Sequence, residues 1–69
     1  PEMNAINYGE IMRLATASLD GLVHGMVNVS NEFESNPREV IEDIEIYMES
    51  VKENLHLLET LIRFYKEAK

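Results

Sequence analysis

Two runs of apolar residues recur at alternating spacings of three and four, and this pattern constrains the fold more than any other feature. The first run contains Ala5, Tyr8, Met12, Ala15, Leu19, Leu22, Met26, Val29 and Phe33. The second contains Ile41, Ile44, Met48, Val51, Leu55, Leu58, Ile62 and Tyr65. A mean period of about 3.5 residues places one apolar stripe along each of two long helices. The pattern therefore predicts an all-α fold.

Pro37 marks the break between the two runs. Its ring suits the first turn of a helix and restricts Asn36 before it, so we expect a second helix over about 37–68. The first helix is expected over about 5–34. The remaining turn, residues 35–36, is so short that the helices must form an antiparallel hairpin. We therefore expect residues 1–69 to form a single domain.

Two asparagines compete for the start of the first helix. Asn4 and Asn7 can each accept a hydrogen bond from a free backbone N–H group in the first turn. Glu10 stands three residues after Asn7, which is the spacing of a capping box. The sequence therefore favours Asn7.

The chain is 45% apolar, which is more than the two stripes can bury between two helices. On the second helix, Val40, Tyr47 and Leu61 lie beside the stripe, and Leu57 and Phe64 widen it. We expect a homodimer in which two hairpins form a four-helix bundle. A monomer that binds a different protein and a higher oligomer are the alternatives. The expected core and dimer seam consists of Met12, Ala15, Leu19, Leu22, Met26, Ile44, Met48, Val51, Leu55, Leu58 and Ile62.

Three glycines fall inside the first expected helix, and two of them lie in its interior. Gly21 and Gly25 each cost about 1 kcal/mol relative to alanine there. Together with Ala15, Ala17 and Ser18 they form a strip of small residues. Close helix packing is the favoured explanation, and a kink or a groove for an external partner remain open.

Thirteen acidic residues against six basic ones give a net charge of −7. A surface of this sign repels phosphate groups, so nucleic acid is not an expected partner. The chain has no cysteine, which excludes disulfides and thiolate zinc sites. The most apolar stretch, 11–29, contains Arg13, Asp20 and His24, so no membrane span is expected. Without a basic region followed by an apolar run, a cytoplasmic location is the expectation.

One short motif points to metal chemistry. Glu53 and His56 have the Glu-x-x-His spacing found in di-iron helical bundles. In the register of the stripe both residues point outward, and Leu55 between them faces the core. We therefore expect neither a bound metal nor a cofactor.

Two further enzymatic interpretations are weaker still. Glu39, Glu42 and Glu45 supply one Glu-x-x-Glu half of the magnesium site of all-α nucleotide pyrophosphatases, but the matching Glu-x-x-Asp half is missing. His24 could accept a phosphoryl group, as in helical phosphotransfer hairpins, but the residue after it is not acidic. The small metal-dependent hydrolase and the phosphotransfer hairpin remain alternatives.

We interpret the chain as a non-enzymatic protein-interaction module, a small acidic regulator, adaptor or inhibitor that forms a homodimer and contacts another protein. Its partner surface is expected where an apolar residue stands among acids on the second helix. That surface consists of Glu42, Glu45, Ile46 and Glu49.

Overall fold

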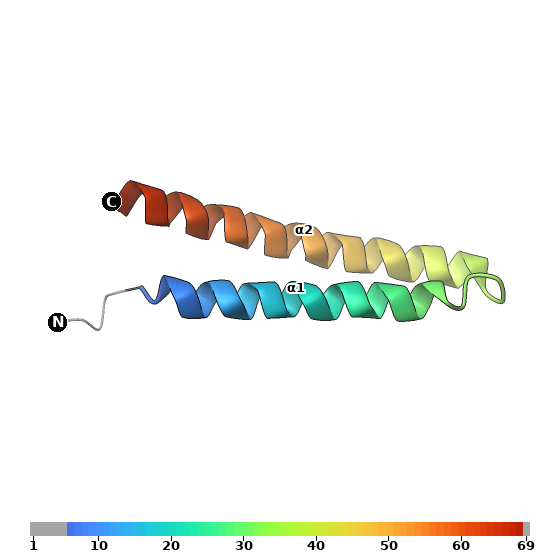
Figure 1. The fold of residues 1–69 in the computed structure, drawn as a ribbon. Helices are drawn as coiled ribbons and strands as arrows, with labels where there is room; N and C mark the ends of the chain where they lie inside the picture. The colour runs from blue at the N-terminus through green and yellow to red at the C-terminus, as the bar shows by residue number, and fades with distance from the viewer. Residues whose placement is uncertain (1–5, 69) are drawn as a thin grey trace.

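A computed structural model describes residues 6–68, so the expectations for Asn4 and Ala5 lie outside the described residues. It contains two helices, α1 (Tyr8–Ser30) and α2 (Pro37–Ala68). They pack side by side in opposite directions and are joined by one tight turn (Figure 1). The extents are 56 × 16 × 15 Å. The predicted all-α hairpin is confirmed.

Asn7 caps α1, as its spacing to Glu10 predicts. Its side-chain Oδ1 accepts a hydrogen bond from the Glu10 backbone N–H at 3.0 Å. The Ile11 N–H donates to the Asn7 carbonyl at 3.1 Å, which closes the first helical turn. The cap satisfies one of the N–H groups that a helix start leaves free.

The end of α1 comes four residues earlier than the expected Glu34. After Ser30 the chain continues in short turns, in which Glu32 N–H donates to Val29 O at 3.0 Å and Phe33 N–H to Ser30 O at 3.1 Å. Ser30 Oγ also bonds to the Val27 carbonyl at 2.7 Å. Serine and asparagine compete locally for backbone groups, and this competition ends the helix although the apolar spacing continues to Phe33.

The residues of α2 that contact α1 are shifted around the helix by one position from the predicted apolar stripe. Buried or half-buried residues of α2 follow this contact at Val40, Ile44, Tyr47, Val51, Asn54, Leu58 and Leu61, and Ser50 and Thr60 are also half-buried. The stripe members Ile41, Met48, Leu55 and Ile62 are 41–50% exposed. Residues expected beside the stripe, such as Tyr47, therefore form the contact within the hairpin.

Tyr47 explains one of the two glycines in the interior of α1. A Cβ atom added to Gly25 would lie 2.6 Å from the Tyr47 ring, whereas one added to Gly21 would meet nothing within 4 Å. Gly25 thus allows an aromatic ring to lie directly on the backbone of α1, in agreement with the favoured explanation of close packing. Gly21 has no such neighbour.

Two further contacts set the register of the hairpin. Asn54 Nδ2 donates to the Ala15 carbonyl of α1 at 3.1 Å in a partly buried position. Near the termini the rings of Tyr8 and Tyr65 meet edge to face, with centroids 5.2 Å apart. These contacts and the Gly25–Tyr47 contact show which levels of the two helices face each other.

The core between the two helices is small. Among the described residues only Ala15, Val40 and Leu61 are buried. The accessible surface is 5602 Å² for a chain of 8.0 kDa. A compact monomer of that mass would expose about 4,450 Å². A single copy of the chain therefore exposes about 1,150 Å² more than a compact domain of its mass.

Candidate protein-interaction surface

One side of the hairpin carries a continuous set of apolar side chains, which we call the open face. It consists of Met12, Leu19 and Met26 of α1 and Ile41, Met48, Leu55 and Ile62 of α2. Within each helix these residues recur every seventh position, so they stand above one another along the hairpin. The α1 members are half-buried and the α2 members are exposed.

The two halves of the open face meet at the same side of the hairpin. Met12 and Ile62 line one shallow hollow together with Tyr8 and Tyr65. Since the helices are antiparallel, the next levels pair Leu19 with Leu55 and Met26 with Met48. The open face thus consists of three rows that each contain one side chain from each helix, and Ile41 of α2 extends it toward the turn.

The expected core and dimer seam is divided by this arrangement. Its members Ala15, Leu22, Ile44, Val51 and Leu58 lie buried or half-buried along the contact between the helices. Its other members belong to the open face and lie beside that contact. They are Met12, Leu19, Met26, Met48, Leu55 and Ile62. The sequence interpretation missed Val40, Tyr47, Asn54 and Leu61 as contact residues, and only the width of the apolar arc could have indicated them.

Charged residues of alternating sign run along the α2 side of the open face. These border residues are Arg38, Glu45, Lys52, Glu59 and Lys66, again one every seventh position. Glu45 and Lys52 share a surface hollow with Met48, and Glu59 and Lys66 share one with Ile62. The apolar rows of α2 therefore have a charged rim, as protein interfaces commonly do.

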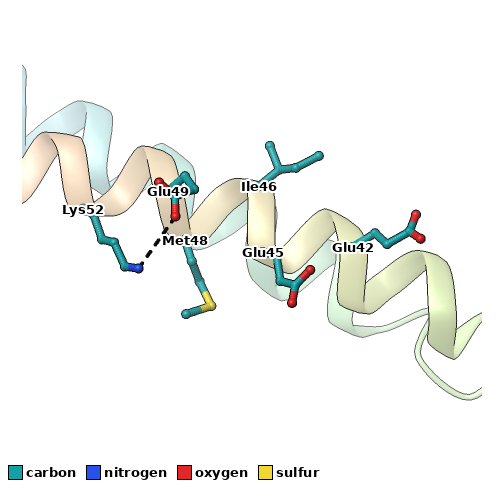
Figure 2. Close-up of a pocket in the computed structure, with 6 residues that line it drawn as sticks. All are labelled: Glu42, Glu45, Ile46, Met48, Glu49 and Lys52. Carbon is teal, nitrogen blue, oxygen red and sulfur yellow. Dashed lines mark ion pairs between the residues drawn. The ribbon is translucent and has the colours of Figure 1, made fainter.

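The expected partner surface lies on the outer side of α2. Figure 2 shows Met48 and Glu45 extending to one side of the helix and Ile46 to the opposite side. The Ile46 side chain is 66% exposed, and all four residues of the expected surface line one hollow with Met48 and Lys52. Lys52 pairs with Glu49 at 3.7 Å. Ile46 is thus an apolar position separate from the open face.

The opposite face of the hairpin is apolar only near the termini. Leu14, Leu57 and Phe64 are 62%, 48% and 48% exposed. The heptad positions that follow Leu57 toward the turn are Ser50 and Asp43, so this apolar patch does not continue. The open face is the one that extends along the full hairpin.

Glu53 and His56 are both exposed, but the residue between them that faces α1 is Asn54 and not Leu55. Leu55 is 45% exposed on the open face. Leu55 thus lies beside the contact within one hairpin, because α2 is turned by one position, and its place in the core of a four-helix bundle stays a prediction. Within residues 6–68, His, Asp and Glu side chains nowhere gather in threes that could hold a metal ion.

The other candidate catalytic residues are also exposed. Glu39, Glu42 and Glu45 follow the outer surface of α2. His24 Nδ1 lies 2.8 Å from the carbonyl of Asp20 one turn earlier and 3.5 Å from its carboxylate. Both side chains are more than 70% exposed. This arrangement is local to one helix and brings no second functional group to the imidazole.

Neither described helix has a stretch long and apolar enough to cross a bilayer. Comparisons with protein-family models, curated proteins and solved structures gave no match.

Proposed function

We propose that the chain is a non-enzymatic protein-interaction module that acts as a homodimer, in which two hairpins join their open faces in a four-helix bundle. The observation that carries this proposal is the open face itself, which leaves three of its four α2 members between 41% and 45% exposed. Regularly spaced apolar rows of this length are typical of bundle cores.

The surface area supports the same assembly. The excess of about 1,150 Å² over a compact monomer exceeds the roughly 800 Å² that each partner buries in an interface of standard size. A second copy of the chain also has the same rows of apolar residues, which can pack against the open face of the first. A twofold dimer needs such a self-complementary surface.

The outer surface of α2 supports the role of an adaptor or regulator. Ile46 stands beside Glu42, Glu45 and Glu49, so a second protein that binds there would present basic residues around an apolar contact. Ile46 stays accessible when the open face is covered, because it projects to the opposite side of α2 from Met48, whereas Glu45 lies at the border of the open face (Figure 2). The dimer would thus carry two copies of it.

Analytical ultracentrifugation of Leu55→Lys against Ile46→Lys tests the dimer. Leu55→Lys puts an unpaired charge into the dimer core, which costs about 3 kcal/mol or more and weakens association at least about 100-fold. Ile46→Lys alters a more exposed residue and should leave the dimer intact. A wild-type chain that sediments as a folded monomer at all concentrations would refute the dimer.

An assay of nucleoside triphosphate hydrolysis tests the non-enzymatic part of the proposal. Among the described residues, no three His, Asp or Glu side chains gather so that they could hold a metal ion. We expect no release of phosphate or pyrophosphate from nucleoside triphosphates with Mg²⁺ or Mn²⁺. Turnover that Glu42→Gln abolishes would replace this proposal with the hydrolase alternative.

A further inference from the structure

The signs of the border charges also indicate how the two copies face each other. Two open faces can meet about a twofold axis in two ways. In the same-end arrangement the turns lie together and each α1 lies beside the partner's α2. In the opposite-end arrangement the turns lie apart, and each helix lies antiparallel to its own copy.

The opposite-end arrangement brings like charges together. The signs of the border residues read the same from either end, with Lys52 in the middle of the series Arg38, Glu45, Lys52, Glu59, Lys66. When the apolar rows of two antiparallel α2 helices are aligned, Lys52 faces Lys52, Glu45 faces Glu59, and Arg38 faces Lys66. Like charges at these flanking positions disfavour a pairing.

The same-end arrangement avoids this repulsion. The border residues then face the edge of the partner's α1, where Thr16, Val23 and Ser30 are uncharged. One position further out, the partner's Asp20 lies level with Lys52, and the partner's Arg13 lies level with Glu59. The charged residues near this edge of the partner's α1 are thus opposite in sign to the border residues at the same level.

A shift of one heptad does not rescue the opposite-end arrangement. Moving one α2 by seven residues brings opposite charges together along the border. It also removes the partner of one apolar row, either that of Ile41 or that of Ile62, and so gives up apolar burial worth about 25 cal/mol per Å². The alignment that keeps every row is the one with the repelling charges.

We propose that two copies associate in the same-end arrangement, with each α1 beside the partner's α2 and both turns at one end of the bundle. This inference rests on the proposed dimer. It goes further because it assigns the border residues Arg38, Glu45, Lys52, Glu59 and Lys66 the role of selecting the orientation.

The distance between spin labels tests the orientation. Because the chain has no cysteine, Ser35→Cys places a single label in the turn of each full-length copy. In the same-end arrangement the two labels lie across the width of a four-helix bundle, about 20–35 Å apart. In the opposite-end arrangement their separation approaches the 56 Å length of the hairpin.

His24→Cys is the matched control, since His24 lies near the middle of the hairpin and is exposed. Labels there give a short distance in both arrangements. A short distance at both positions supports the inference. A short distance at His24 with a long one at Ser35 overturns the orientation and retains the dimer. No dipolar coupling at either position, at concentrations where the chain is folded, overturns the dimer as well.

Discussion

The ring of Tyr47 in α2 lies directly on the backbone of Gly25 in α1. Its Cε1, Cζ and hydroxyl oxygen are each 2.6 Å from where a Cβ of residue 25 would stand. This contact places a large half-buried ring between the helices at a level where α1 has no side chain. It makes Gly21 and Gly25 unequal, although they stand only one turn apart.

Replacing each glycine by alanine should therefore have opposite effects. Gly21→Ala meets open space and raises the free energy of unfolding by up to about 1 kcal/mol through helix propensity. Gly25→Ala gains the same propensity but must displace the Tyr47 ring, so we expect a net loss of about 1–2 kcal/mol. Urea denaturation followed by circular dichroism measures both changes.

Tyr47→Leu provides the control for this explanation, because it shortens the side chain that Gly25 accommodates. In that background Gly25→Ala should become neutral or stabilising. If Gly25→Ala destabilises both backgrounds equally, the contact with Tyr47 does not account for the glycine.

Asn54 is a polar residue at a position between the helices, where it donates to the Ala15 carbonyl. We expect Asn54→Leu to stabilise the hairpin by about 1 kcal/mol, because apolar burial replaces one hydrogen bond and no buried donor is left unpaired. The same change should loosen the register of the two helices, since a single polar contact often fixes it. Denaturation and the dispersion of amide NMR signals would report the two effects, and a lower stability would contradict the first.

The melting temperature should rise with protein concentration. Only Ala15, Val40 and Leu61 are buried among the described residues, so a single hairpin has little apolar burial to oppose the loss of chain entropy. If folding is coupled to association, mass action stabilises the folded state as concentration increases. Thermal melts over a hundredfold range of concentration would show this, and a constant melting temperature would indicate a stable monomer.

Charge exchange between Asp20 and Lys52 should reveal their pairing across the dimer. Lys52→Glu alone places two acids at the same level and weakens the dimer, and Asp20→Lys in addition restores it. We expect a coupling energy of about 0.3–1 kcal/mol between the two changes, which high salt should reduce. A double-mutant cycle on the dimer dissociation constant measures it. Lys52→Glu combined with His24→Lys is the control, because it returns one of the two lost units of charge at another exposed position of α1, and it should give the smaller coupling.

The sequence predicted both helices, the start of α2 at Pro37 and the cap at Asn7, because spacing and capping chemistry are local properties. It did not predict which side of α2 faces α1. The apolar arc of α2 is three positions wide, so Tyr47, Val51 and Met48 are all reasonable contact residues, and the glycine that receives Tyr47 is on the other helix. The end of α1 was missed because Phe33 continues the apolar spacing into the turn.

The small core between α1 and α2 has a consequence for how such a protein is controlled. If a copy gains most of its stability from a second copy, synthesis below the dissociation constant yields unfolded chains that proteases remove. Above that concentration the chains protect one another. The amount of active protein would then respond steeply to its rate of production, without any ligand or modification.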